Sequence, residues 1–120
     1  MSHNLNQQLS EHTFHFAQSV REFGKVLPNT VSNVEDLKEL IRSSGAVGSS
    51  YIAAAEATNK QDYLIRMKDS GKELKTAQYW LRLVDTQGDS LLEEKRKRLI
   101  HVSQELLNVF FKILHSSGVK

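Results

Sequence analysis

The chain has no cysteine, only one proline among its 120 residues, and no apolar run near the length of a membrane span. The absence of cysteine excludes disulfide frameworks, thiolate zinc sites and cysteine nucleophiles. A single proline argues against a loop-rich β sandwich. A membrane-spanning helix needs roughly 20 apolar residues, and the polar start, MSHNLNQQLSEH, lacks the apolar core of a signal peptide. We therefore expect a cytoplasmic protein that does not associate with a membrane.

Charge is nearly balanced over the whole chain but is unevenly distributed along it. The net charge is +2, with 39% hydrophobic and 25% charged residues, which is a globular composition. Residues 1–60 hold five Lys/Arg against six Asp/Glu, whereas residues 61–120 hold eleven against eight. The second half is thus mildly basic, well short of the excess that by itself indicates nucleic-acid binding.

Apolar residues recur every three to four positions in four blocks, which predicts four helices. The blocks cover residues 5 or 10 to 27, 32–57, 60–85, and 89 or 90 to 115. The residues expected to face a common core are Leu9, Phe16, Val20, Phe23, Leu27, Val34, Leu37, Leu40, Ile41, Val47, Tyr51, Ala55, Leu64, Met67, Gly71, Leu74, Ala77, Leu81, Val84, Leu92, Leu99, Val102, Leu106, Val109 and Ile113.

Turn and capping residues separate these blocks. Pro28 ends the first helix, because proline has no backbone N–H for the helical ladder. Ser32-x-x-Glu35 and Ser90-x-x-Glu93 have the spacing of capping boxes at the starts of the second and fourth helices. Gly88 suits a left-handed cap after the third helix.

The glycine-serine stretch SSGAVGSS lies in the middle of the second block. It lacks the Lys-Ser/Thr ending of a phosphate-binding loop and follows no strand. The apolar residues keep their helical spacing across this stretch, so we expect it to be helical. Its small side chains should allow a neighbouring helix to pack closely.

Short connections between long helices make sequential helices antiparallel. The sequence therefore predicts an all-α fold, an antiparallel up-down-up-down four-helix bundle. Residues 1–120 form a single domain in this prediction, with frayed ends at about residues 1–8 and 116–120.

The fourth helix carries a second apolar stripe beside its core-facing one. Together the two stripes cover roughly 200° of the helix, about twice the arc of an ordinary core-facing helix. Phe14 and Tyr79 also fall outside the main stripes of their helices. Either the fourth helix is the most enclosed of the four, or the surplus apolar surface mediates self-association. The residues expected at an oligomer interface are Tyr79, Trp80, Ile100, Leu107, Phe111 and Leu114.

No pattern of catalytic or metal-ligating residues appears. A di-iron bundle needs Glu-x-x-His pairs on facing helices, and no acidic residue has a histidine three positions later. His12 and His15 share a helix face but have no further ligand pair, which favours a surface role. No G-x-S-x-G elbow is present. We expect no catalytic residue, no metal and no cofactor, and hence not an enzyme.

Basic residues form the most suggestive polar pattern. Four lie along one face of the third helix, and four more follow one another at the start of the fourth. Either these cations form a solvated surface, or they contact nucleic-acid phosphates. Trp80 beside Tyr79 is read as a core or interface aromatic in preference to a base-stacking platform. The candidate nucleic-acid-binding residues are Lys68, Lys72, Lys75, Arg82, Lys95, Arg96, Lys97 and Arg98.

Two stretches, LIRSSGAVGSSYIAAAEA and KDSGKELKTAQYWLRLV, resemble the signature segments of the bacterial intervening-sequence family. Members of that family are four-helix-bundle proteins encoded by reading frames within insertions in 23S rRNA genes. FAQSVREFGKVLPNTVSN also fits, and the similarity covers roughly residues 13–115. The chain departs from the pattern at Ser50, Ala53, Thr76 and Gln78. The matching positions are Arg42, Ser43, Val47, Gly48, Tyr51, Lys72, Glu73, Tyr79, Trp80 and Leu81.

The resemblance implies a four-helix bundle that assembles into a homopentameric ring. It also implies a relation to the accessory protein of diversity-generating retroelements, a basic pentamer that engages a reverse transcriptase and nucleic acid. We therefore expect an oligomeric binding protein whose basic surface contacts RNA or DNA backbone. The alternative is a protein–protein scaffold or accessory subunit that docks a partner enzyme without binding nucleic acid.

Overall fold

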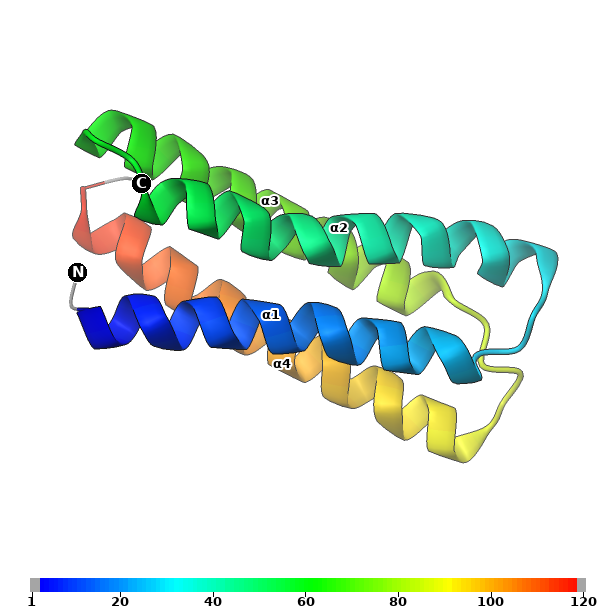
Figure 1. Cartoon of the computed structure of the whole chain (residues 1–120). Helices are drawn as coiled ribbons and strands as arrows, with labels where there is room; N and C mark the ends of the chain where they lie inside the picture. The colour runs from blue at the N-terminus through cyan, green and yellow to red at the C-terminus, as the bar shows by residue number, and fades with distance from the viewer. Residues whose placement is uncertain (1–2, 119–120) are drawn as a thin grey trace.

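The four apolar blocks form four helices in a computed structural model that describes residues 3–118. They are α1 (His3–Val26), α2 (Val31–Ala55), α3 (Lys60–Leu83) and α4 (Ser90–Ser116). Each helix packs against two others, α1 and α3 both contacting α2 and α4. Figure 1 shows α1 and α2 in front of α4 and α3, with consecutive helices antiparallel. The predicted all-α four-helix bundle is confirmed.

The ends of the helices differ somewhat from the prediction. Helix α1 begins at His3, within the segment expected to be frayed, and α4 continues to Ser116. Residues 1–2 and 119–120 of the predicted frayed ends lie outside the described residues. No helix in the described part of the chain is long and apolar enough to cross a membrane.

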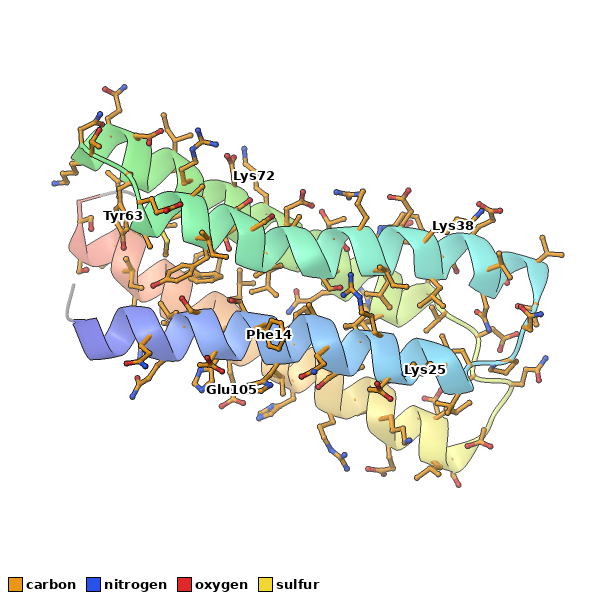
Figure 2. All side chains as sticks on the ribbon, viewed as in Figure 1. Phe14, Lys25, Lys38, Tyr63, Lys72 and Glu105 are labelled. Atoms are coloured by element: carbon orange, nitrogen blue, oxygen red, sulfur yellow. The ribbon has the colours of Figure 1, made fainter. Side chains whose placement is uncertain are left out.

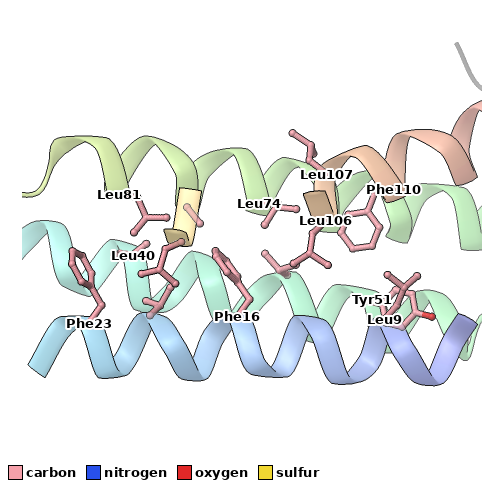
Figure 3. Packing of buried hydrophobic residues seen from close by; sticks show 14 of the residues in the cluster. Leu9, Phe16, Phe23, Leu40, Tyr51, Leu74, Leu81, Leu106, Leu107 and Phe110 are labelled. Atoms are coloured by element: carbon pink, nitrogen blue, oxygen red, sulfur yellow. The ribbon is translucent and has the colours of Figure 1, made fainter. Parts of the chain in front are cut away.

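One hydrophobic core is shared by all four helices. Figure 3 shows Leu9, Phe16 and Phe23 of α1 pointing toward residues of the other helices, including Leu40 and Leu106. Most of the predicted core residues are buried or half-buried. Val34 and Ala55 are exposed instead, because Asn33 and Ala54 are the buried residues of these two end turns and the next position points about 100° away.

Helix α4 is rotated relative to the expected orientation. Its buried face includes Ser103, Leu107, Phe110 and Leu114. The half-buried residues Val102, Val109 and Ile113, which were expected in the core, lie at its edge. The buried face thus lies between the two apolar stripes read from the sequence, because α4 packs against α3 on one side and α1 on the other. Phe110, which belongs to neither predicted stripe, is completely buried.

The glycine-serine stretch is helical throughout, as predicted. Its small residues bring backbones together: Ser70 Oγ of α3 donates a hydrogen bond of 2.7 Å to the Val47 carbonyl of α2. A Cβ at Gly48 would lie only 3.4 Å from Thr13 Oγ1 of α1. Both α1 and α3 therefore approach α2 closely along this stretch.

Both predicted capping boxes are wrong in position. The N-cap of α2 is Thr30, which accepts a hydrogen bond from Asn33 N, so the helix begins before Ser32. The N-cap of α4 is Asp89, the alternative start, rather than Ser90. The N-cap of α3 is Asn59, whose side chain accepts a hydrogen bond from Asp62 N.

The turn before α4 also differs from its predicted form. Gly88 has a φ of +76°, but α3 already ends at Leu83, so this glycine completes the turn instead of capping the helix. Gln87 precedes it with a φ of +55°, which is also left-handed.

Asn33 connects the two loops at the end of the bundle opposite the α2–α3 connection. Its Nδ2 donates to the carbonyls of Pro28 at 2.9 Å and Asp85 at 2.8 Å. Its Oδ1 accepts from Asp85 N at 2.8 Å. Only 3% of Asn33 is exposed. One buried amide therefore ties the α1–α2 connection to the α3–α4 connection.

We expect Asn33→Ala to lower the free energy of unfolding by roughly 2–3 kcal/mol, because it leaves buried backbone groups without partners. Asn33→Asp should cost at least as much, since a carboxylate cannot donate to the two carbonyls. Urea denaturation followed by circular dichroism measures both. Ser32→Ala is the control and should change stability by less than about 0.5 kcal/mol. A larger decrease in the free energy of unfolding for Ser32→Ala would show that Ser32 is the helix cap.

Candidate nucleic-acid interface

The four predicted cations of α3 lie on the side of that helix that borders α4. Lys75 Nζ stands 5.2 Å above the Phe111 ring of α4, and Lys68, Lys72 and Arg82 follow the same stripe at helical spacing. All four are exposed. At 1.5 Å per residue, the row from Lys68 to Arg82 is roughly 20 Å long.

These α3 cations differ from several others in having no carboxylate partner. Lys25, Lys38 and Arg42 on the first two helices each lie within 3.4 Å of a glutamate oxygen. Among the described residues, Lys68, Lys72, Lys75 and Arg82 make no such ion pair. Glu73 of the same helix points to the opposite side, where it pairs with Arg42. The row consequently has no direct ion pair, and the carboxylate nearest to it along the helix is Asp69, between Lys68 and Lys72.

The four consecutive cations of α4 do not form one patch with Arg82. Successive helical residues are about 100° apart, and the rotation of α4 distributes their side chains over three directions. Arg96 turns toward the end of α3, Lys95 and Arg98 line a groove against α1, and Lys97 is exposed. Only part of the predicted cluster is therefore available to a ligand on the α3–α4 side.

Arg96 has a structural role. Its Nη1 donates to the Val84 carbonyl at 2.6 Å, just past the end of α3. Its guanidinium also pairs with Glu93, which accepts a hydrogen bond from Thr86. A cation at the negative end of a helix macrodipole is favourable. Arg96 therefore caps α3, and its contact with phosphate stays a prediction.

The residues predicted for an oligomer interface do not share one surface. Leu107 and Leu114 are only 3% and 8% exposed and belong to the core. Ile100 and Trp80 are half-buried against that core. The burial of Ile100, Leu107 and Leu114 follows from the rotation of α4, which takes part of its second apolar stripe inside. These six residues therefore do not form one surface on the single chain.

Tyr79 and Phe111 remain exposed, at 54% and 46%. Tyr79 meets Trp80 edge to face with ring centroids 5.1 Å apart, and Phe111 lies beneath Lys75. The two exposed aromatics thus accompany the basic row. The sequence alone suggests one role for the lysines and another for these rings, whereas the structure places them on one surface.

A row of side-chain amides, which the sequence analysis missed, crosses from α3 to α4. Gln78 Nε2 donates to Ser103 Oγ at 2.9 Å and to Gln104 Oε1 at 3.2 Å. Gln104 Nε2 donates in turn to Asn108 Oδ1 at 3.0 Å. The i, i+4 spacing of Gln104 and Asn108 is visible in the sequence, but their proximity to Gln78 depends on the helix pairing.

A groove of about 880 Å³ separates α1 from α4. Phe16 and Leu106 belong to its apolar floor, while Glu22 of α1 and Lys95 and Arg98 of α4 are among its charged residues. The groove contains Val102 and Val109, two of the half-buried apolar residues that the rotation of α4 moves out of the core. The full lining is His12, His15, Phe16, Gln18, Ser19, Glu22, Phe23, Lys95, Arg98, Leu99, Val102, Glu105, Leu106 and Val109.

The titratable groups of the described residues do not form a metal site. No group of three His, Cys, Asp or Glu side chains is placed to hold an ion. His15 Nε2 lies 3.5 Å from Glu11, and its Nδ1 lies 3.3 Å from Gln18 Oε1. Burial raises the pKa of Tyr51 to about 12, so its phenol stays neutral at physiological pH.

Neither a protein-family model nor a curated protein sequence matches the chain. A crystal structure of a protein of unknown function from the S23 ribosomal protein family of Bacteroides thetaiotaomicron has a similar fold, with a TM-score of 0.80. The alignment covers 92% of this chain and 97% of that one, at 20% sequence identity. At this identity the likeness establishes the fold alone.

Replacing Arg96 by Gln should lower the free energy of unfolding by roughly 1–3 kcal/mol, since it removes charge-assisted hydrogen bonds to the end of α3. Lys97→Gln removes the same charge from the adjacent exposed position and should change stability by less than about 0.5 kcal/mol. Urea denaturation compares the two variants. Equal stabilities would show that Arg96 does not hold the end of α3.

Proposed function

We propose that the protein is a non-enzymatic, oligomeric helical bundle that contacts the backbone of RNA or DNA through a basic surface. The observation that supports this most directly is the row of exposed, unpaired cations on α3: Lys68, Lys72, Lys75 and Arg82. Lys25 and Lys38 on the first two helices have glutamate partners, whereas these four cations form no ion pair among the described residues. Phosphate groups of a nucleic acid supply the missing counter-charges.

The mechanism is phosphate contact with release of condensed counterions, which carries little sequence information. A net charge of +2 per chain gives only weak attraction. In a ring, several copies of the row engage one nucleic acid at the same time, and the effective concentration of the later contacts raises the avidity. Assembly is thus part of the proposed function.

The resemblance to proteins encoded within 23S rRNA gene insertions, and through them to a retroelement accessory protein, supports contact with nucleic acid. The family name of the structural neighbour, S23 ribosomal protein, is consistent with contact with nucleic acid. Membership of the intervening-sequence family and the retroelement relation are parts of this proposal, and so is the homopentameric ring.

We place the contact between subunits at the α1–α4 groove, with a second copy of this chain as its occupant. The groove leaves Val102 and Val109 partly uncovered. Its charged rim presents Glu22 on α1 opposite Lys95 and Arg98 on α4, so it complements a surface that bears charges of both signs, as this chain does. Covering it leaves the basic row of α3 free.

Binding to a fluorescently labelled RNA hairpin should weaken steeply as the salt concentration rises. The variant Lys68→Gln/Lys72→Gln should bind more weakly, and the slope of log K against log salt should become shallower by about 0.7–0.9 for each phosphate that is no longer neutralised. Fluorescence anisotropy measures both quantities.

The matched control is Lys25→Gln/Lys38→Gln, which removes the same charge from paired lysines elsewhere on the bundle; Figure 2 labels both. An equal decrease in affinity in both variants would show that binding follows net charge and not the α3 row. No binding at any salt concentration, together with co-purification of a defined protein through high-salt washing, would favour the scaffold alternative.

Light scattering should give a particle mass of five times the 13.6 kDa of one chain. Ser19→Arg places a long cation in the α1–α4 groove from an exposed position of α1 and should reduce that mass, because it blocks the incoming copy. Ser49→Arg makes the same change on the exposed side of α2 and should leave the mass unchanged. A monomeric native protein would reject the ring, and a Ser19→Arg variant of full mass would place the interface elsewhere.

A further inference from the structure

We infer that the α3–α4 side of the bundle binds single-stranded nucleic acid, with bases stacked on Tyr79 and Phe111. This stacking face consists of Lys72, Lys75, Gln78 and Tyr79 of α3 and Gln104, Asn108 and Phe111 of α4. The inference rests on the proposed function, because it presupposes binding of nucleic acid, and it adds which form of nucleic acid is bound and how.

The first observation is that aromatic rings and cations alternate along one line. On α3 the order is Lys72, Lys75, Tyr79 and Arg82, and Phe111 of α4 lies under Lys75. Phosphate-binding cations that flank exposed aromatic rings are the usual elements of a surface for single strands. Duplex nucleic acid offers its phosphates to such a surface but keeps its bases stacked inside.

The two aromatic residues lie farther apart than stacked bases. Tyr79 follows Gln78, which contacts Gln104, and Phe111 lies seven residues, roughly 10 Å, beyond Gln104 along α4. Lys75 reaches from α3 over the Phe111 ring. Neighbouring bases along one strand of a duplex are only about 3.4 Å apart. The surface therefore suits a single strand whose bases are drawn apart, with Lys72 and Arg82 contacting its phosphates.

The amide row supplies polar groups next to the rings. Gln104 and Asn108 are exposed, on the α4 side of the row. Their hydrogen bonds to each other and to Gln78 hold the amides in place before a ligand arrives. Side-chain amides both donate and accept, so they match the exposed edges of unpaired bases.

Negative charge is directed away from this surface. Glu73 pairs with Arg42 on the α2 side of α3. Glu105 lines the α1–α4 groove and lies 3.3 Å from His101. At the far end, Glu93 is neutralised by Arg96. A polyanion approaching the lysines of α3 therefore does not meet an uncompensated carboxylate from these residues.

The test compares a labelled 15-nucleotide oligo(dT) strand with a 15-base-pair DNA duplex by fluorescence anisotropy. The native protein should prefer the single strand. The variant Tyr79→Ala/Phe111→Ala should lose affinity for it on the order of fivefold or more, with the salt slope nearly unchanged and the duplex affinity little altered. Trp80, the only tryptophan and in contact with Tyr79, should show quenched emission when the strand binds.

Phe14→Ala is the matched control, because Phe14 is an exposed aromatic on α1, 60% accessible and remote from Lys72 in Figure 2. It should leave single-strand affinity unchanged. Equal affinity for strand and duplex, or undiminished affinity in Tyr79→Ala/Phe111→Ala, would overturn stacking while leaving backbone binding intact. Absence of all nucleic-acid binding would overturn both proposals. A change of particle mass in Tyr79→Ala/Phe111→Ala would assign the two rings to a subunit interface instead.

Discussion

The rotation of α4 about its own axis determines how the surface of this protein is organised. Burial of Ser103, Phe110 and Leu114 selects that rotation, because the helix must fill the space between α3 and α1 at once. The same rotation turns Arg96 toward the end of α3 and brings Phe111 under Lys75. The orientation of α4 therefore determines both the packing of the core and the positions of the surface side chains.

Polar groups that bond to backbone close one end of the bundle. Asn33 bridges the two connections there, and Arg96 caps α3 next to Asp85. Backbone groups in the connections lack the hydrogen-bond partners that a helix interior provides. Those that are buried therefore need hydrogen bonds to side chains. Asp85 lies 52 residues from Asn33 and Val84 lies 12 residues from Arg96, which explains why neither residue stands out in a linear reading.

Much of the fold was predictable from the sequence, because apolar residues that recur every three to four positions indicate helices directly. Leu9, Phe16 and Val20, or Met67 and Leu74, lie at positions that only one face of a helix brings together, and all are buried. The rotation of α4 about its axis was harder to predict. Its apolar arc is so wide that several orientations of the helix would bury a similar apolar area. Phe110 shows the difficulty, because it lies between two plausible stripes and yet is completely enclosed.

The candidate site was predictable only in part. Helical spacing placed Lys68, Lys72 and Lys75 together, and these residues are exposed on one side of α3 as expected. The fourth-helix cluster could not be resolved in the same way, because consecutive residues point in different directions and depend on the helix rotation. The amide row and the contact of Lys75 with Phe111 require knowledge of how two helices align, which is a tertiary property.

The ammonium group over Phe111 has a further consequence for how the surface works when it is empty. A cation over an exposed ring stabilises the contact by about 0.5–1 kcal/mol. A flat molecule that stacks on Phe111 must therefore first displace the Lys75 ammonium group. Small aromatic solutes gain little from that exchange, since they offer no anion to the displaced charge. Under the proposed binding mode, a polymer that carries both a planar group and an anion would replace both interactions, so Lys75 would favour ligands that contain both groups.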